Sequence, residues 1–486
     1  MKIREVIQVL GEPLLSGDAE QMVSAVVCDS RSVLPGAVFV CIGGARFDGH
    51  EFIEEAIQRG AILIIAERAV HVPEPIGLLH VGSSREALAR LAHVFHGAAG
   101  DRLHITGITG TNGKTSTAFM LQHLLQSASM KTGLIGTVQY DLGDRVLPAQ
   151  RTTPEADELH AYLGEMQRCD CEAAVMEVSS HAIDMKRVSG LLFDVVLFTN
   201  LSHDHLDYHA DMEEYFRVKC RLFSQTKENA IAVVNGDDAY GQRLIKELSV
   251  PVIAFGEGEN TALQVRADRI KTRAKGTCFY VYSPWGEGWI HLLLLGRFHV
   301  VNALAAMSVA GSCGISFEAM QAAFKRVPSI PGRLELIRTF SQRRIFIDYA
   351  HTPDALEAVL KTLRSWVRGK LWVVFGCGGN RDQQKRILMG RIASTHADRV
   401  VLTSDNPRRE DPILICRDIL EGWVDSNRPH VEIDRKKAIG YAMRRMKRGD
   451  VLLVAGKGHE TYQEVNGTVV PFEDRLVIEA WTKRCS

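Results

Sequence analysis

Short apolar runs alternate with amphipathic stretches along the first hundred residues of the chain. The runs at 38–42, 61–66 and 78–81 have the length of buried strands, and the apolar positions of 51–59 recur with the period of a helix. Alternating strands and helices predict a small α/β unit, to which we assign residues 1–100.

From residue 103 a strand leads into a glycine-rich turn and a helix. Apolar strands follow at 173–178, 195–199 and 230–234 with helical stretches between them, which is typical of a parallel sheet. A hairpin-like pair of runs, at 277–282 and 289–295, interrupts this pattern before a helix at about 300–312. This second predicted unit is α/β and spans residues 101–330.

The remaining residues, 331–486, repeat strand and helix and predict a third α/β unit. The expected strands are 345–348, 371–375, 399–403 and 451–454, and the expected helices are 353–366, 412–423 and 436–446. Parallel strands joined by helices imply right-handed crossovers, and such open sheets bind ligands at the carboxyl ends of their strands. Residues that directly follow a strand are therefore the site candidates.

Composition narrows the expected partners to small molecules. The 486 residues include 58 Lys and Arg and 58 Asp and Glu without a run of like charges, so no nucleic-acid-binding arm is expected. The apolar runs fall far short of the ~20 residues that span a bilayer, and the first residues resemble no secretory signal. We expect a cytoplasmic protein without membrane insertion, with ten scattered, reduced cysteines of no catalytic role. Its oligomeric state is not predicted.

A phosphate-binding loop is the strongest chemical signal. Such a glycine-rich turn between strand and helix directs backbone N–H groups at a polyphosphate, with a lysine for the β- and γ-phosphates and a hydroxyl for Mg²⁺. Ile108 stands where the strict motif has glycine, so the loop is a variant, and an ordinary turn is the competing interpretation. The predicted loop residues are Gly110, Thr111, Asn112, Gly113, Lys114, Thr115 and Ser116.

Two further strands end in residues suited to a metal ion. Glu177 closes the run at 173–178, and His205 follows the run at 195–199. The carboxyl ends of parallel strands meet at one sheet edge, where a metal that bridges phosphates needs oxygen or nitrogen ligands. We predict Glu177 and His205 as such ligands, against the alternative that His205 caps a helix or bonds a carbonyl group.

Four motifs together resemble the Mur ligase family, which are ATP-dependent amino-acid ligases of peptidoglycan precursor synthesis. The motifs are GTNGKT at 110–115, EVSSH at 177–181, DHLDYH at 204–209 and DYAHTPD at 348–354. The resemblance covers essentially the whole chain and is closest to the members that add the third residue of the stem peptide. It implies an N-terminal UDP-substrate-binding domain, a central P-loop ATPase domain and a C-terminal, Rossmann-like domain for the amino acid.

The resemblance also implies a reaction and its catalytic residues. ATP would phosphorylate the D-glutamate side chain of UDP-N-acetylmuramoyl-L-alanyl-D-glutamate, and the amine of an amino acid would attack the acyl phosphate. Phosphoryl transfer between anions needs charge neutralisation and alignment, which suits Lys114 and Mg²⁺. Lys219 matches the family's carbamylated lysine, a ligand for a second Mg²⁺. The implied catalytic residues are Lys114, Lys219, His205 and Glu177, and the implied metal ligands are Thr115, Glu177, His205 and carbamylated Lys219.

Substrate positions follow from the same resemblance. Nucleotide contacts fall on Asn302, Arg333 and Asp348, besides the phosphate loop. Contacts with the UDP-muramoyl dipeptide fall on Cys28, Ser30, Ala45, Arg46, Phe47, Thr152, Thr153, Ser179 and Arg187.

The segment Asp405-Asn406-Pro407-Arg408 matches the form that marks ligases adding meso-diaminopimelate. A guanidinium grips a carboxylate through two hydrogen bonds, and diaminopimelate has one carboxylate more than lysine. An Arg408 buried without that carboxylate would cost several kcal/mol, so strong rejection of lysine is expected. The other implied amino-acid contacts are Arg381, Gly456 and Glu460.

Two positions depart from the family pattern, and other functions remain open. His299 stands where the family usually has Asn, and Asn380 where it usually has Asp. The alternatives are the same reaction with L-lysine, a folylpolyglutamate synthetase, the next muramyl ligase, or a nucleotide-binding regulator without catalysis. The residues predicted to bind metal and phosphate argue against a regulator without catalysis. The segment 405–408 argues against the other ligases.

Overall fold

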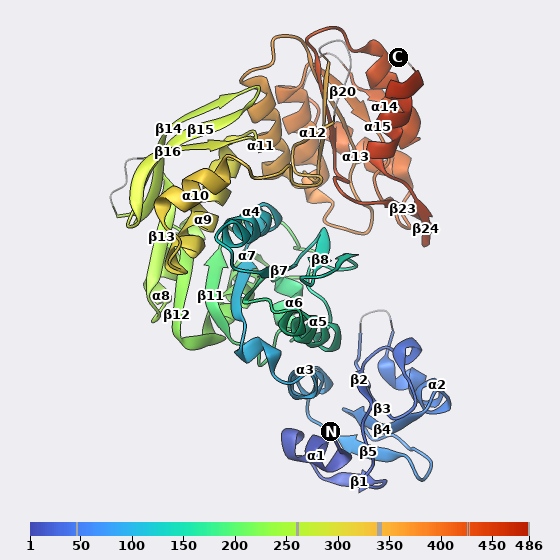
Figure 1. The fold of residues 1–486 in the computed structure, drawn as a ribbon. Helices are drawn as coiled ribbons and strands as arrows, with labels where there is room; N and C mark the ends of the chain where they lie inside the picture. Colours follow the sequence, from blue (N-terminus) through green and yellow to red (C-terminus); the bar gives the residue numbers. More distant parts are fainter. Residues whose placement is uncertain (45–46, 259–261, 338–342, 425, 427, 485–486) are drawn as a thin grey trace.

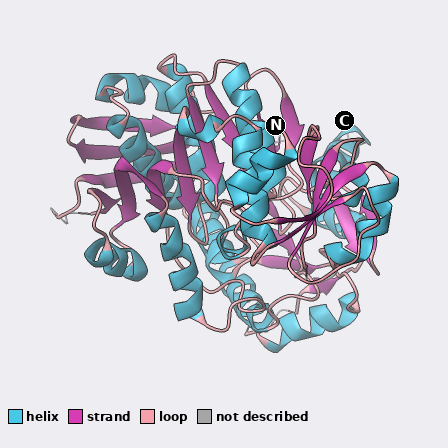
Figure 2. Ribbon diagram, turned by 90° about the horizontal axis from the view of Figure 1, so that it is seen from below, coloured by secondary structure: helices cyan, strands magenta, loops and turns pink. Residues whose placement is uncertain are grey.

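The chain folds into three α/β units, each built on its own sheet and following one another along the chain (Figure 1). The computed structural model describes residues 1–44, 47–258, 262–337, 343–424, 426 and 428–484. Helices lie on both sides of the strands (Figure 2). We call these the N-terminal, central and C-terminal units.

The N-terminal unit has a five-stranded sheet with the order β1-β5-β4-β3-β2. All neighbours pair in parallel except β1, which is antiparallel to β5. Its apolar core lies between the sheet and its helices. The elements are α1 (Ile3–Leu10), β1 (Leu14–Ser16), β2 (Ala25–Val27), η1 (Ser30–Ser32), β3 (Ala37–Val40), η2 (Gly49–Phe52), α2 (Ile53–Gln58), β4 (Ala61–Ala66), β5 (Gly77–His80) and α3 (Ser84–Phe95).

The central unit has an eleven-stranded sheet with the order β16-β15-β14-β13-β12-β11-β6-β10-β7-β8-β9. Its strands are β6 (His104–Thr109), β7 (Thr132–Ile135), β8 (Gln139–Asp141), β9 (Val146–Pro148), β10 (Ala173–Glu177), β11 (Phe193–Phe198), β12 (Thr226–Asn235), β13 (Val252–Glu257), β14 (Val265–Arg273), β15 (Gly276–Ser283) and β16 (Gly286–Leu292). Its helices are η3 (Ala99–Asp101), α4 (Lys114–Ser127), α5 (Ala156–Arg168), α6 (Ser180–Asp184), α7 (Met212–Cys220), η4 (Arg221–Ser224), α8 (Ala239–Glu247), α9 (Arg297–Ser312) and α10 (Phe317–Phe324).

Strand β6 lies in the middle of this sheet, paired in parallel with β10 on one side and β11 on the other. The carboxyl ends of these three strands therefore meet at one edge. On one face of the sheet, apolar side chains of α4 and α9 form a continuous core with the strands. This packing holds the N-terminus of α4 at the same edge.

The C-terminal unit has a six-stranded sheet with the order β17-β18-β22-β19-β20-β21, and a separate hairpin of β23 and β24. Only β17 is antiparallel to its neighbour in the six-stranded sheet. The elements are β17 (Glu335–Ile337), β18 (Arg344–Asp348), α11 (Pro353–Arg364), β19 (Leu371–Phe375), α12 (Gln384–His396), β20 (Arg399–Leu402), α13 (Pro412–Glu421), β21 (His430–Val431), α14 (Arg435–Arg445), β22 (Val451–Ala455), β23 (Tyr462–Val465), β24 (Thr468–Pro471) and α15 (Asp474–Arg484).

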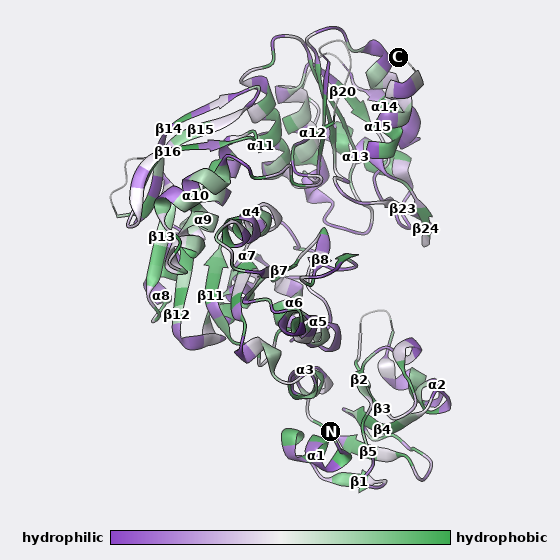
Figure 3. Cartoon of the chain, in the orientation of Figure 1, coloured by the Kyte–Doolittle hydropathy of each residue, from purple (hydrophilic) through white to green (hydrophobic). Residues whose placement is uncertain are grey.

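The predicted α/β class is confirmed, but the hairpin expected as an interruption of the second unit is an extension of its sheet. β15 and β16 continue the sheet through β14, which is parallel to β13 and antiparallel to β15. β14 escaped prediction because arginine and lysine side chains recur along its outer half, and the strand carries hydrophilic colour in Figure 3. Across the described part of the chain, no helix has the length and apolar character needed to cross a membrane.

Candidate active site

The loop between β6 and α4 is closed by hydrogen bonds from its own lysine. The Lys114 ammonium donates to the carbonyl oxygens of Gly110, at 2.8 Å, and Thr111, at 2.9 Å. Gly110 and Gly113 have φ angles of +138° and +91°, a region that favours glycine. Burial lowers the pKa of Lys114. A tight loop with a cation at a helix N-terminus is suited to bind phosphate oxygens.

Glu177, at the end of β10, is buried beside this loop and fully engaged in hydrogen bonds. One carboxylate oxygen accepts from the Thr115 hydroxyl at 2.9 Å and from the Thr137 hydroxyl at 2.9 Å, and the other accepts from the Thr137 amide at 2.9 Å. The Thr115 hydroxyl in turn accepts from Nη2 of Arg333 at 2.8 Å. Arg333 belongs to the segment before β17, so this chain of contacts joins the central and C-terminal units.

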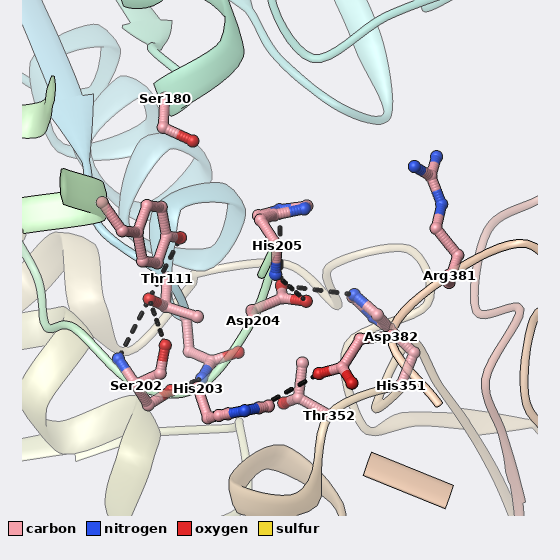
Figure 4. Close-up of polar contacts among 12 residues, drawn as sticks. Thr111, Ser180, Ser202, His203, Asp204, His205, His351, Thr352, Arg381 and Asp382 are labelled. Atoms are coloured by element: carbon pink, nitrogen blue, oxygen red, sulfur yellow. Dashed lines mark hydrogen bonds and ion pairs between the residues drawn. The ribbon is translucent and has the colours of Figure 1, made fainter. Parts of the chain in front are cut away.

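Asp204 lies between two imidazole rings, as Figure 4 shows. Its Oδ2 is 3.3 Å from Nε2 of His205 and 3.9 Å from Nε2 of His351, which comes from the C-terminal unit. Burial lowers the pKa of His205 to about 3 despite the nearby carboxylate. His205 is therefore neutral near pH 7 and has a ring nitrogen lone pair to offer.

Lys219 lies on α7 with its ammonium buried beneath the phosphate loop. Its Nζ is 3.1 Å from the Gly110 carbonyl oxygen and 4.5 Å from the centre of the Tyr215 ring. Among the described residues no carboxylate forms an ion pair with it. Burial, reinforced by the charge of Lys114, moves the pKa of Lys219 well below its usual value and so favours the neutral amine.

A cavity of about 500 Å³ opens above these groups, between the central and C-terminal units. Most of the residues predicted to bind nucleotide or metal line it, whereas Gly110 and Lys219 lie behind its wall. The predicted residues in its lining are Thr111, Asn112, Gly113, Lys114, Thr115, Ser116, Thr152, Glu177, His205, Asn302, Arg333 and Asp348.

Asp348, at the end of β18, is fixed at the rim of the cavity by backbone amides. Its two carboxylate oxygens accept from the amides of Leu334, at 2.5 Å, and Ala350, at 2.7 Å. Burial raises the pKa of Asp348 to about 6 although these bonds and the Arg333 charge act in the opposite direction. The Arg333 guanidinium stacks on the ring of Tyr349, 4.8 Å from its centre, so one short segment supplies an anion, a cation and an aromatic face.

Of the residues predicted for the muramoyl dipeptide, those in the central unit lie together. The Thr153 hydroxyl donates to the Glu177 carbonyl oxygen at 2.8 Å and accepts from the Ser179 amide at 3.2 Å. Arg187 donates to the Thr153 carbonyl oxygen at 3.1 Å and pairs with Glu155 at 2.9 Å. Thr152 reaches the same place through its hydroxyl, 3.1 Å from that of Thr137.

The residues predicted for UDP lie apart from the cavity, in the N-terminal unit. The Ser30 hydroxyl donates to Glu55 at 2.9 Å, and the Cys28 amide donates to Asp157 of α5 at 3.1 Å. Phe47 is 70% exposed. Ala45 and Arg46 lie outside the described residues.

The residues predicted for the amino acid gather at the carboxyl edge of the C-terminal sheet, after β20 and β22. The Asn406 side-chain amide donates to Glu460 at 2.9 Å. The buried Lys457 ammonium donates to Asn406 Oδ1 at 3.0 Å and to the same Glu460 oxygen at 2.8 Å. A Cβ on Gly456 would lie 2.4 Å from Asp405 Oδ2, so glycine lets these two segments meet.

Both arginines predicted for the amino-acid site already pair with carboxylates of the chain. Arg381 Nη1 lies 3.2 Å from Asp207 Oδ2 in the central unit. Arg408 Nε lies 3.2 Å from Glu464 Oε2, and its Nη1 donates to the Gly379 carbonyl oxygen at 2.7 Å. β23 thus supplies Arg408 with a carboxylate partner inside the chain, which reduces the cost of a bound ligand without a distal carboxylate.

The fold accommodates both departures from the family pattern. Asn380 takes a left-handed conformation, φ +51°, which asparagine tolerates, and its Oδ1 accepts from the Arg409 amide at 3.1 Å. His299 is fully buried near the start of α9, and neither ring nitrogen bonds to a described residue. Burial lowers the pKa of His299 to about 3, so its ring is neutral.

Three residues of the site were not predicted. Thr137 follows β7, the strand next to β10, and the rule that polar residues after parallel strands line the site would have found it. Asp204 directly precedes His205, within a motif already singled out. Lys457 sits between glycines in the loop after β22, where the same rule applies.

A phosphate loop on a parallel sheet, completed by a second α/β unit, defines a nucleotide-binding protein of the P-loop type. Residues 22–96 match the Mur ligase family catalytic domain, residues 108–310 the Mur ligase middle domain and residues 332–458 the glutamate ligase domain of Mur ligases. The chain belongs to the Mur ligase family, whose members are ligases.

Two curated relatives bear the name UDP-N-acetylmuramoyl-L-alanyl-D-glutamate–2,6-diaminopimelate ligase. That of Geobacillus kaustophilus is 44% identical over 466 residues, 94% of each chain. That of Aquifex aeolicus is 43% identical over 458 residues, 94% of this chain and 93% of the relative. A solved structure of the same name superposes with a TM-score of 0.68 at 31% identity, covering 100% of this chain and 99% of the other. A folylpolyglutamate synthase of Mycobacterium tuberculosis shares the fold, with a TM-score of 0.64 at 19% identity over 76% of this chain and 91% of its own.

Proposed function

We propose that this ligase adds meso-diaminopimelate to the D-glutamate side-chain carboxylate of UDP-N-acetylmuramoyl-L-alanyl-D-glutamate, with cleavage of ATP to ADP and phosphate, in peptidoglycan precursor synthesis. The observation that carries the proposal is the cavity between the phosphate loop and the Arg333–Asp348 segment, with the amino-acid cluster of residues 405–408 and 456–460 in the same C-terminal unit. The name shared by relatives that cover nearly the whole chain supports the choice of substrates.

In the proposed reaction the chain supplies positive charge where the γ-phosphoryl group of ATP meets the substrate carboxylate. The ATP phosphates lie along residues 110–116, with Lys114 and Arg333 neutralising the γ-phosphoryl group as it passes to the D-glutamate carboxylate. The amine then attacks the acyl phosphate carbon and the C–N bond forms. The C–O bond breaks, inorganic phosphate leaves with its oxygen and electron pair, and the nitrogen loses a proton. Asn302 and Asp348 hold the nucleotide, and Thr152, Thr153, Ser179 and Arg187 the dipeptide.

The donor set of the site fits Mg²⁺. Thr115 and Glu177 offer oxygen atoms and His205 a neutral imidazole, which would hold the ion together with the phosphate oxygens of the nucleotide. Mg²⁺ would neutralise phosphate charge. The missing anion is proposed to be a carbamate on Lys219, because burial lowers the pKa of this lysine and so favours the neutral amine, the form that adds CO₂ and releases a proton.

Each unit has a proposed task. Residues 1–100, with Cys28, Ser30 and 45–47, bind the UDP end of the substrate, residues 101–330 bind ATP, and residues 331–486 bind the amino acid. Arg381 and Arg408 face its carboxylates and Glu460 its distal ammonium, beside Asp405, Asn406, Pro407 and Gly456. Since the reaction consumes ATP and a UDP-linked precursor, we assign it to the cytoplasm.

The test is ADP release by the purified protein with Mg·ATP and the UDP-muramoyl dipeptide, comparing meso-diaminopimelate, L-lysine and no amine. Release that depends on diaminopimelate, with a product heavier by that residue, supports the proposal. L-lysine is the second candidate, because the Glu464 partner of Arg408 reduces the penalty for a ligand without a distal carboxylate. If neither diaminopimelate nor L-lysine stimulates ADP release, both candidate reactions are refuted.

A further inference from the structure

The hairpin strand β23 is joined to the 405–408 segment by its backbone. The Arg408 amide donates to the Glu464 carbonyl oxygen at 3.1 Å, and the Asn466 amide donates to the Arg408 carbonyl oxygen at 2.6 Å. The Glu464 amide donates to Asn406 Oδ1 at 3.0 Å. Arg408 itself has a φ of +53°. Backbone contacts on both sides thus fix the two residues next to each other before any ligand arrives.

The ion pair between Arg408 and Glu464 leaves part of the Arg408 guanidinium available to a ligand. Arg408 uses Nε for Glu464 and Nη1 for the Gly379 carbonyl oxygen, and Nη2 has no hydrogen-bond partner within the described chain. The side chains of Arg408 and Glu464 are 18% and 22% exposed, so a ligand can reach them. A distal carboxylate that binds at Nη2 shares the guanidinium with Glu464.

The other acid of the cluster does not play the same part. Glu460 is held by the Lys457 ammonium at 2.8 Å and by Asn406 at 2.9 Å, and forms no ion pair with Arg408 among the described contacts. Glu464 pairs with Arg408 alone among the described cations. Glu410 also lies close enough to feel the charge of Arg408, but it pairs with Arg386, so Glu464 is the acid whose carboxylate contacts the Arg408 guanidinium.

We infer that Glu464 is a specificity-determining residue, which weakens the preference of the site for a distal carboxylate over a distal ammonium. The inference rests on the proposed function and deepens it. A negative charge beside Arg408 repels an incoming carboxylate and attracts an ammonium, since like charges this close raise each other's free energy and opposite charges lower it. Glu464 thus compensates Arg408 when the bound ligand has no distal carboxylate.

The substitution Glu464→Gln separates charge from position. The amide oxygen of Gln can still accept from Arg408 Nε, so the guanidinium keeps its place while its charge is no longer compensated. Two analogues probe the charge as competitors of meso-diaminopimelate: 2-aminopimelate has a distal carboxylate without an ammonium, and L-lysine an ammonium without a carboxylate. We expect the inhibition constant of 2-aminopimelate to fall and that of lysine to rise, each about two- to fivefold, as for partly exposed charge pairs.

The inference requires the two inhibition constants to shift in opposite directions. If Glu464 had a purely structural role, its replacement would weaken the binding of both analogues. Shifts in the same direction, no shift in either, or no competition by either analogue in the wild type would overturn it. Glu421→Gln on α13, an exposed acid without an ion pair to any described residue, is the matched control and should move neither constant. The KM for ATP should stay constant in both variants.

The same assay distinguishes this inference from the proposed function. Wild-type ADP release that requires diaminopimelate, combined with unchanged constants in Glu464→Gln, refutes the role of Glu464 alone. A wild type that releases no ADP with any amine refutes the ligase reaction, and the inference with it. Glu464→Ala also removes the oxygen that accepts from Arg408 Nε. If this oxygen positions Arg408, 2-aminopimelate should bind the Ala variant more weakly than it binds the Gln variant.

Discussion

Burial decides which charged residues of the site carry a charge. Burial lowers the pKa of Lys219 and of His205, because the excluded water no longer stabilises their charged forms. The site thereby gains the imidazole lone pair of His205 at neutral pH and a lysine whose neutral form is favoured. Their chemistry follows from their depth in the fold as much as from their residue type.

Replacing Lys219 by Ala should abolish ligation, because the site then loses its proposed carbamate and no described carboxylate replaces it. Added formate or acetate should partly restore ADP release by supplying the anion. Lys246→Ala, an exposed lysine of α8, serves as the control and should stay active. Full activity of Lys219→Ala without added acid would contradict the carbamate.

Asp348 should make the protein less stable as the pH rises. Its folded pKa of about 6 lies above the unfolded value of about 3.9, so the folded state binds more protons between these values and stability falls across that window. Asp348→Asn removes this loss. Relative to wild type, the free energy of unfolding of the variant should therefore increase from pH 4 to pH 7, by up to about 3 kcal/mol.

Urea unfolding at the two pH values measures this difference. The exposed Asp18→Asn variant should show no such change. A difference between wild type and Asp348→Asn that is independent of pH would mean that the backbone amides hold the carboxylate ionised throughout.

At this scale the sequence predicted most residues around the cavity but not their partners. Lys114, Glu177, His205 and Arg333 stand directly after strands or in motifs, so their position along the chain reveals them. The pairs Arg408–Glu464 and Arg381–Asp207 join residues far apart in the chain. No local pattern contains such a contact, so the sequence did not predict Glu464 as the partner of Arg408.

Among elements, the turn from β6 to α4 depends on the absence of a side chain at Gly113. A Cβ there would lie 2.5 Å from Asn302 Oδ1, at a φ of +91° that L-residues rarely adopt. Gly113→Ala should weaken Mg·ADP binding at least tenfold, since the loop must move away from α9 or strain its backbone, at a cost of order 1–3 kcal/mol.

The measurement is the dissociation constant of Mg·ADP by calorimetry. Gly190→Ala separates the two causes, because Gly190 also has a positive φ, +76°, but nothing lies within 4 Å of its added Cβ. Equal loss of affinity in both variants would show that general destabilisation, and not the contact with Asn302, is responsible.

Elements with a clear hydrophobic period were predicted nearly to the residue. β4 and β19 have the predicted bounds, because both are apolar throughout and end at polar or glycine residues. The hairpin of β23 and β24 was missed because its residues are half-exposed or exposed, so burial leaves no period in the sequence. That hairpin nevertheless contributes Glu464 to the site.

On the scale of the whole molecule, the nucleotide cavity belongs to two units at once. A ligand that binds the folded form stabilises it by an amount that grows with its concentration, about 2.7 kcal/mol at 100 times the dissociation constant. Mg·ADP should therefore raise the unfolding temperatures of the central and C-terminal units together.

Scanning calorimetry tests this coupling. Arg333→Ala, which removes the contact with Thr115 across the units, should reduce the shift of the C-terminal unit more than that of the central unit. The exposed Arg326→Ala is the control. A nucleotide that stabilises only the central unit in the wild type would contradict a shared pocket.

The sequence predicted three α/β units but could not say how they meet. Hydrophobic periodicity reports that a residue is buried but not which unit it packs against, and Leu295 of the central unit is buried in the core of the C-terminal unit. Other contacts between units are polar, such as His203 with Asp382 at 3.2 Å and His351 with Asp204 at 3.9 Å (Figure 4). Polar contacts of this kind leave no periodic trace.

The link between Arg408 and strand β23 has a consequence for synthesis on the ribosome. Domains generally fold as units, those nearer the N-terminus first. A growing chain can therefore complete its phosphate loop while Arg408 still lacks the backbone partners that β23 provides. Translation products released before β23 would keep the loop and lose the contacts that fix Arg408, so the part of the chain that we propose to bind the amino acid is finished last.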